Sequence, residues 1–318
     1  MEILQTVLYV VLLLVIAGFL AAHVFTRSTA RKVREGLPPR GEFMDVEGGK
    51  LHYVDKGEGP PIVLIHGLSG NLENFGYALI DRLAEDYRVI AVDRPGCGYS
   101  TRENDGLARL PNQAAMTAEL IEKLGLEKPL IAGHSLGGAV SLFMALNHPG
   151  QVGALAMLAP LTAVQESSPS VFKGLDIPNA LVRRFIGNTL AIPMSLRQGS
   201  AVLDVVFAPE AAPADFRLRG GGLLTLRPEA FYAASTDLHS VPLDMPGVQS
   251  RYGEISVPLG MLYGDGDAVL QHDKHIEAIR RHHPDMELRV MEETGHMPIV
   301  TRPEECIAFI RDMSAKIS

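Results

Sequence analysis

The stretch that decides the fold is LIAGHSLGGAV, Leu130–Val140, in which Ser135 lies among glycines directly after an apolar run. A strand-like segment precedes Ser135, and a helix-like segment, Gly138–Asn147, follows it. This order predicts a sharp strand-to-helix turn of the kind that exposes a nucleophilic serine above a sheet. The backbone of that serine is strained, so side chains two positions away would collide with the turn. Gly133 and Gly137 occupy those positions and allow the turn to form.

A serine hydroxyl needs a base to become a nucleophile, and the base needs an acid to orient it. Two later stretches carry suitable residues: GDGDAV, with Asp265 and Asp267, and ETGHMP, with His296. The chain order serine, aspartate, histidine is the one expected for this type of turn. We therefore expect His296 to be the base, while the residues alone leave both aspartates open as the acid.

Serine attack on a carbonyl creates an oxyanion, which backbone N–H groups can stabilise. One donor is expected at Leu136, at the start of the following helix, where the helix dipole favours negative charge. The second is expected at Leu68, in the stretch HGLSGN. His66 and Gly67 would shape that loop, with His66 as a hydrogen-bonding residue rather than a second base.

From residue 42 onward, short β-rich runs alternate with helical stretches, which predicts a doubly wound, mostly parallel α/β sheet of eight strands. The expected strands are 43–46, 51–55, 62–65, 88–92, 129–132, 154–158, 258–263 and 287–291. EGGK at Glu47–Lys50 predicts a hairpin, so the sheet should begin antiparallel. The interval 161–256 has no clear strand and predicts a mostly helical cap, inserted between core segments 42–160 and 257–318.

The N-terminus predicts a membrane anchor. No charged residue lies between Glu2 and Arg27, and the apolar run is long enough to cross a bilayer as a helix. A secretory signal peptide would start with basic residues and have a shorter apolar run. We expect residues 1–30 to form the anchor and residues 31–41 a basic linker. The positive charge beside the anchor predicts a single-pass protein of the cell membrane with its main domain on the cytoplasmic side.

Small residues recur four positions apart in the anchor, at Ala17 and Ala21 and at Gly18 and Ala22. Such spacing lets two membrane helices approach closely, which makes a homodimer through this helix a hypothesis. Small residues also fall at this spacing by chance in apolar helices.

Composition excludes several classes of protein. The 318-residue chain carries a net charge of −8, so no nucleic-acid partner is expected. Cys97 and Cys306 are far apart in the sequence, which excludes a disulfide framework and gives no zinc-binding spacing. We expect neither a metal nor an organic cofactor.

Five motifs fall in the order and spacing of the α/β-hydrolase fold family: HGLSGNLENF, DRPGCGYS, GHSLGGAV, GDGD and GHMP. The chain resembles this family over about residues 42–160 and 257–318. The resemblance implies Ser135 as nucleophile, His296 as base and Asp267 as acid. It also implies that DRPGCGYS is a structural turn, with its cysteine a packed thiol.

The serine narrows the expected chemistry. Epoxide hydrolases and haloalkane dehalogenases of that family carry aspartate at this turn, whereas serine implies acyl transfer to water. The layout is similar to membrane-bound monoacylglycerol lipases, so the leading hypothesis is a serine esterase or lipase acting on apolar esters at the bilayer. A carbon–carbon bond hydrolase or a cofactor-free perhydrolase would use the same triad, and a non-catalytic hydrolase-fold receptor or scaffold is the third hypothesis.

Cap arginines bear on these alternatives. A carbon–carbon hydrolase would need polar groups in its cap for a carboxylated dienone, and Arg183, Arg184 and Arg197 are candidates. In the stretch Leu181–Met194, an apolar stripe could instead touch lipid and place Arg183 and Arg184 near anionic head groups. The other interpretation is that the stripe packs on the core and the two arginines are solvated.

Overall fold

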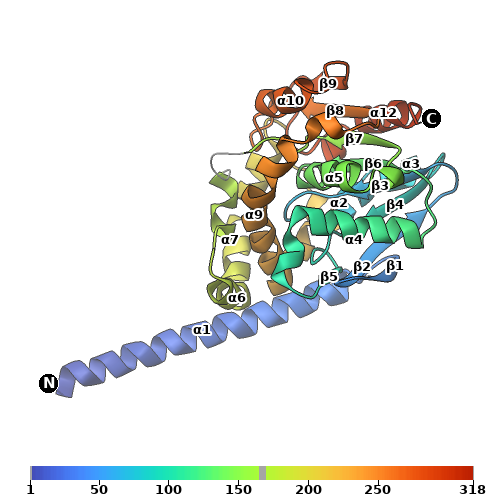
Figure 1. Ribbon diagram of the computed structural model, residues 1–318. Helices are drawn as coiled ribbons and strands as arrows, with labels where there is room; N and C mark the ends of the chain where they lie inside the picture. Colours follow the sequence, from blue (N-terminus) through green and yellow to red (C-terminus); the bar gives the residue numbers. More distant parts are fainter. Residues whose placement is uncertain (1, 165–169, 318) are drawn as a thin grey trace.

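The computed structural model describes residues 2–164 and 170–317 (Figure 1). Within them, nine strands form one mixed sheet in the order β1-β2-β4-β3-β6-β7-β8-β9, with β5 paired to β2. The strands are β1 (Glu42–Val46), β2 (Gly49–Lys56), β3 (Pro61–Ile65), β4 (Arg88–Val92), β5 (Thr101–Arg102), β6 (Leu130–His134), β7 (Ala154–Leu158), β8 (Leu259–Gly264) and β9 (Glu287–Met291). The sheet begins antiparallel and is parallel from β4 to β9. The predicted α/β-hydrolase architecture is confirmed, with one strand more than predicted, because two-residue β5 is too short to leave a pattern.

Helices cover both faces of the sheet (Figure 1). One layer contains α4 (Leu110–Lys123), α5 (Leu136–Asn147) and α10 (His272–Arg280), and the other contains α2 (Glu73–Gly76), α3 (Ile80–Leu83), α11 (Pro298–Thr301) and α12 (Pro303–Ser314). Side chains alternate between the two faces of the sheet along β3. Val63 and Ile65 pack in the core on one face, and Ile62 and Leu64 pack in the core on the other. Burial on both faces explains why this strand is apolar throughout.

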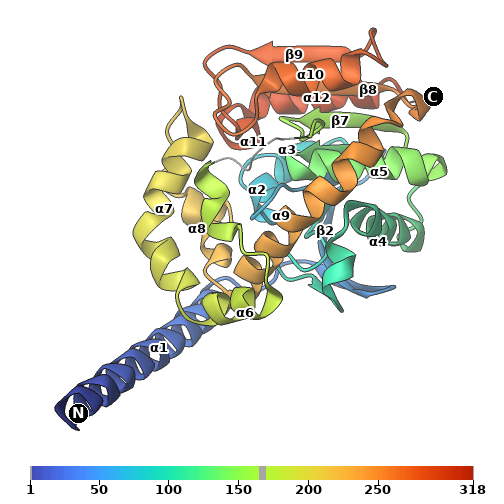
Figure 2. The same cartoon turned by 60° about the vertical axis from the view of Figure 1, so that its left-hand side comes forward.

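The chain segment that connects β7 to β8 forms a cap, which stands to one side of the sheet (Figure 2). Its described residues form η3 (Ser170–Leu175), α6 (Ala180–Asn188), α7 (Ala191–Phe207), α8 (Phe216–Arg219), η4 (Gly222–Thr225), α9 (Pro228–Gln249) and η5 (Tyr252–Glu254). Helices α6 and α7 are bent by 79° relative to each other. Residues 165–169 of the predicted cap lie outside the described residues.

Helix α1 (Glu2–Gly36) is continuous over 35 residues and projects from the domain (Figure 1). Its most apolar 18-residue window has a mean hydropathy of 2.7 and is not buried. The helix continues beyond residue 30 into the predicted linker, so only Leu37–Gly41 connects it to β1. The extension is stabilised by packing, because Val33 joins a small apolar cluster with Ile192 and two leucines of the η4 region.

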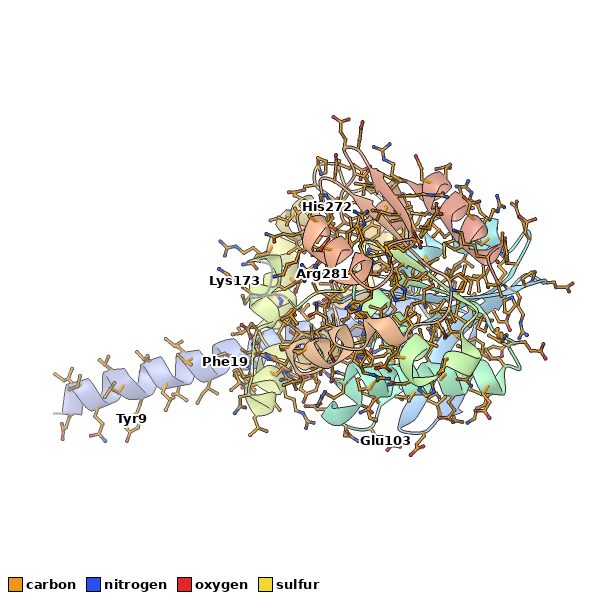
Figure 3. The ribbon with its side chains drawn as sticks, turned by 45° about the horizontal axis from the view of Figure 1, so that its top comes forward. Tyr9, Phe19, Glu103, Lys173, His272 and Arg281 are labelled. Atoms are coloured by element: carbon orange, nitrogen blue, oxygen red, sulfur yellow. The ribbon has the colours of Figure 1, made fainter. Side chains whose placement is uncertain are left out.

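The second half of α1 packs on the cap. Phe19 meets Phe185 of α6 edge to face with ring centroids 5.0 Å apart, and the buried Thr26 hydroxyl donates to the Thr189 carbonyl at 2.9 Å. In Figure 3, Tyr9 lies on the projecting part of α1, whereas Phe19 lies where the helix reaches the body. Ala22 is half-buried on the same stripe as Phe19, so it faces the cap.

Candidate active site

Ser135 occupies a strained turn between β6 and α5, with φ 53° and ψ −118°. Its neighbours leave no space for larger residues. A Cβ at Gly137 would stand 2.0 Å from the Ile65 carbonyl oxygen, and one at Gly133 would stand 2.4 Å from the Ser141 hydroxyl. The two glycines therefore permit the close approach of β3 and α5 that the turn requires.

The structure brings Ser135, His296 and Asp267 together. The Ser135 hydroxyl lies 2.9 Å from His296 Nε2, and His296 Nδ1 lies 2.7 Å from Asp267 Oδ2. The other carboxylate oxygen of Asp267 accepts the backbone N–H groups of Val269 and Leu270 at 2.8 and 2.9 Å. Burial alone would raise the pKa of Asp267, but His296 and these two donors outweigh it and hold that pKa below its usual value.

Strand order explains why these distant residues meet. Ser135 follows β6, Asp267 follows β8 and His296 follows β9, and these strands run parallel. Their carboxyl ends lie along one edge of the sheet, where open α/β sheets gather their site residues. Asp265, the other aspartate in GDGDAV, is exposed. The arrangement can transfer a proton from the serine to an imidazole that an ionised carboxylate orients.

The loop after β3 lies against Ser135, since a Cβ at Gly67 would stand 2.9 Å from Ser135 Cβ. This loop carries Leu68, and Leu136 is the first residue of α5, where backbone N–H groups have no partner within the helix. The two expected oxyanion donors thus belong to segments that border the serine. An oxyanion formed at Ser135 would meet the positive end of α5.

The His66 ring is buried and makes hydrogen bonds to the backbone through both of its nitrogens. Its Nδ1 donates to the Gly67 carbonyl at 2.8 Å, and its Nε2 accepts the Arg94 backbone N–H at 3.0 Å. Burial and the nearby Arg94 lower the pKa of His66 to about 4, so the ring is neutral at pH 7. Both ring nitrogens of His66 are thus engaged by backbone groups, one in its own loop and one in the loop after β4.

His134 also lies beside the site. Its Nε2 donates to the backbone carbonyl of His296 at 2.8 Å, and the two rings are 5.1 Å apart. Burial and then His296 lower the pKa of His134 to about 3, which keeps it neutral. Because successive side chains of a strand point to opposite faces, the sequence indicates only that His134 points away from the Ser135 side chain. The sequence held no signal that the loop carrying His296 folds against it.

Two further residues near the site were missed. Arg94 is fully buried and donates to the carbonyl of His66 at 2.9 Å and to that of Gly67 at 3.0 Å. Glu210, in the cap, accepts the N–H of Gly295, the residue before His296, at 3.1 Å. An arginine directly after a buried strand, in the turn DRPGCGYS, was a usable signal. An isolated glutamate in the cap was not.

Two other residues that the sequence analysis considered are buried and make no contact with the hydrogen-bonded serine, histidine and aspartate set. Cys97 is buried, and burial raises its pKa to about 12, so it is a packed thiol. Arg183 is buried as well and donates to the carbonyls of Ile177 and Pro178, both at 3.2 Å. Neither interpretation of Arg183 holds, because its guanidinium is buried in hydrogen bonds and so neither reaches lipid head groups nor is solvated. Among the described residues, no cluster of histidine, cysteine, aspartate or glutamate has the arrangement of a metal site.

Known proteins share this architecture. A model of the alpha/beta hydrolase family matches residues 62–309, which include all three residues of the hydrogen-bonded serine, histidine and aspartate set. The chain belongs to the alpha/beta hydrolase family. Among curated members of similar sequence, a dihydrolipoyllysine-residue acetyltransferase component of an acetoin-cleaving system from Cupriavidus necator is 37% identical over 121 residues. That match covers 38% of this chain and 32% of that protein, so the chain spans less than half of that relative's length.

Two other known proteins match most of the chain. A 2-hydroxy-6-oxononadienedioate/2-hydroxy-6-oxononatrienedioate hydrolase from Pseudomonas putida is 28% identical over 252 residues, which are 78% of this chain and 85% of that protein. A crystal structure of a bacterial membrane phospholipase A superposes with a TM-score of 0.66 and 27% identity. That alignment covers 97% of this hydrolase chain and 98% of the phospholipase chain, and so includes most of α1.

Proposed function

We propose that this chain is a membrane-anchored serine hydrolase that cleaves apolar carboxylic esters, with Ser135 as nucleophile, His296 as base and Asp267 as acid. The observation that carries the proposal is the hydrogen-bonded series from the Ser135 hydroxyl through His296 to the Asp267 carboxylate. It stands at a strained turn beside a helix N-terminus, where a tetrahedral oxyanion gains stabilisation.

The geometry supports a two-step acyl transfer. Ser135 Oγ attacks the ester carbonyl while His296 Nε2 takes its proton, and the N–H groups of Leu68 and Leu136 receive the oxyanion. Collapse breaks the bond to the alcohol, which leaves with the proton from His296, and an acyl-serine remains. Water then attacks the acyl-serine with His296 again as base, and collapse releases the carboxylic acid and restores Ser135. Asp267 stays ionised throughout and holds the imidazole in its orientation.

The exposed apolar surface of the protein supports the proposal that its substrate comes from a bilayer. The projecting part of α1 has the length and hydropathy of a membrane span, and the basic residues after it favour the cytoplasmic side for the catalytic domain. Large apolar side chains on the adjoining cap helices are also exposed, among them Leu181 at 76%, Phe185 at 48% and Met194 at 47%. A surface of this kind is typical of contact with membrane or partner. The membrane phospholipase A, similar over nearly the whole chain, points in the same direction.

Carbon–carbon bond hydrolysis is the second candidate, because the Pseudomonas putida hydrolase is similar over most of its length. The substrates in the name of that hydrolase are dicarboxylates. The cap arginines that could bind such a substrate are engaged or exposed here: Arg183 is buried in contacts within the cap, and Arg184 and Arg197 are exposed. This placement favours an uncharged ester over a carboxylated dienone.

A substrate series on the full-length protein in detergent tests the proposal. We expect hydrolysis of p-nitrophenyl esters and monoacylglycerols, labelling by a fluorophosphonate probe, and loss of both in Ser135→Ala. A folded wild-type protein that neither labels nor hydrolyses esters would be a scaffold instead. Turnover of a carboxylated dienone in preference to every ester would favour carbon–carbon cleavage.

A further inference from the structure

A buried ionic cluster joins the cap to the core beside the active site. Asp237, in the middle of α9, has no exposed surface and pairs with two core arginines, Arg94 and Arg102. Arg94 Nη1 lies 2.8 Å from Asp237 Oδ2, and Arg94 is itself fully buried. A buried guanidinium of this kind needs a counter-charge, and among the described residues Asp237 is the only carboxylate within ion-pair distance of Arg94.

Two other donors of Arg94 reach the loop that carries the expected oxyanion donor, while Nη1 also donates to Gln113 Oε1 at 2.7 Å. Its Nε donates to the His66 carbonyl at 2.9 Å and its Nη2 to the Gly67 carbonyl at 3.0 Å. The Gly67 carbonyl and the Leu68 N–H belong to one planar peptide unit and point in opposite directions. Whatever fixes the direction of the Gly67 carbonyl therefore fixes the direction of the Leu68 N–H.

We propose that Asp237 and Arg94 are positioning residues for the oxyanion hole: the cap carboxylate holds the arginine. The arginine, together with the His66 ring and the Gly70 N–H that donate to the same Gly67 carbonyl, aims the Leu68 N–H toward the tetrahedral intermediate at Ser135. The close approach of Gly67 to Ser135, where a Cβ would stand 2.9 Å from Ser135 Cβ, places this peptide within the site. In this role helix α9 contributes to stabilising the charge that develops in the reaction.

The cap offers a matched control on the same helix. Asp244, two turns after Asp237, is also buried and also pairs with a core arginine, Arg109. Its carboxylate accepts Arg109 Nε at 2.7 Å and the Leu110 N–H at 2.8 Å. These contacts tie α9 to the start of α4 and do not include the loop after β3. Loss of Asp244 therefore loosens the cap without releasing the Gly67 carbonyl.

The experiment compares Asp237→Asn with Asp244→Asn in full-length protein, using p-nitrophenyl butyrate kinetics, thermal unfolding and inhibition by a tetrahedral-forming alkyl boronic acid. We expect Asp237→Asn to lower kcat by about 10- to 100-fold, since loss of one oxyanion donor costs about 100- to 1,000-fold and misdirection costs less. KM should change less than about threefold, and the inhibition constant of the boronic acid should rise in parallel with the fall in kcat. Asp244→Asn should keep kcat within about threefold of wild type even at an equal loss of Tm.

Equal losses of kcat in the two variants, or an effect of Asp237→Asn on KM alone, would overturn the inference. Arg94→Lys keeps the charge opposite Asp237, so it guards against a variant that fails to fold. One ammonium cannot reach the carboxylate and both carbonyls with the planar geometry of a guanidinium, so kcat should fall here too. Wild-type kcat in Arg94→Lys would also overturn the inference. The inference rests on the proposed function, whose failure would show separately, as a wild-type protein without esterase activity.

Discussion

Gly67 and Ser135 are in such close contact that a Cβ on the glycine would stand 2.9 Å from the Cβ of the serine. The same Cβ would stand 3.2 Å from His134 Nδ1. An alanine at position 67 must therefore push the loop away from the serine. This pair of residues sets how near the expected oxyanion donor can come to the reacting carbonyl.

We expect Gly67→Ala to lower kcat by about 10- to 100-fold while the protein stays folded, because displacing an oxyanion donor weakens stabilisation of the transition state. Steady-state kinetics on a soluble ester, with a thermal melt of the same sample, measure this. Gly150→Ala is the matched control, since a Cβ there meets nothing within 4 Å. Wild-type kcat in Gly67→Ala would mean that the loop does not need this approach.

The two aspartates of GDGDAV should differ sharply in their effect on activity. Asp267→Asn removes the charge that faces His296 Nδ1 at 2.7 Å, and an amide there can favour the wrong imidazole tautomer. We expect kcat to fall by about 10,000-fold. Asp265→Asn changes an exposed side chain and should alter kcat less than about twofold. Burst and steady-state assays on purified variants compare them, and the reverse ranking would identify Asp265 as the acid.

Much of this site could be anticipated from local sequence. GHSLGGAV determines its own strand-to-helix turn, and Asp267 and His296 follow strands whose apolar character is plain, so their meeting at one sheet edge follows from topology. Contacts made by the cap could not be anticipated. Asp237 and Glu210 reach the site only through the packing of helices whose positions no local pattern sets.

The boundary of α1 illustrates the same limit. Hydropathy marks the apolar run, which ends near Ala22, but the helix continues to Gly36 because Thr26, Ala30 and Val33 pack against the cap. That stabilisation comes from tertiary contacts, which a sequence window does not contain.

Because three histidines are buried, we expect the folded protein to lose stability in mild acid. Burial, as the largest cause, lowers the pKa of His66, His134 and His275 to about 4, 3 and 4. Unfolded histidine titrates near pH 6.5, so between about pH 6.5 and 4 the unfolded chain binds more protons than the folded one. Their contribution to stability is complete above pH 6.5 and is lost as the pH falls toward 4.

We expect the urea midpoint of unfolding to fall steadily from pH 7 to pH 4.5. His275→Gln should flatten this dependence, because His275 Nδ1 accepts the N–H groups of Thr162 and Ala163 and the glutamine carbonyl can accept without titrating. A midpoint that is constant over this pH range in the wild type would contradict the prediction.

The course of helix α1 allows its proposed membrane role to be tested separately from its contacts with the cap. Residues 2–18 lie before the contact of Phe19 with Phe185, whereas Thr26 and Ala30 are buried on the cap. Removing residues 2–18 should leave the hydrolysis of a short soluble ester within about twofold of wild type, because the cap contacts survive. The same deletion should lower the rate on a long-chain ester in phospholipid vesicles, because the domain no longer concentrates at the bilayer. Hydrolysis assays on both substrates, with vesicle co-sedimentation, measure the two effects.

Two controls complete this last test. An unrelated apolar helix of the same length in place of residues 2–18 should restore the vesicle rate, since the bilayer responds to length and hydropathy rather than to particular side chains. Deleting residues 2–30 should lower both rates, because it also removes Thr26 and Ala30 and exposes the cap surface they cover. Equal activity of the wild type and the 2–18 deletion on vesicles would show that the cap captures lipid unaided. Loss of the short-ester activity in that deletion would mean instead that the first half of α1 supports the fold of the cap and, through Asp237, the geometry of the site.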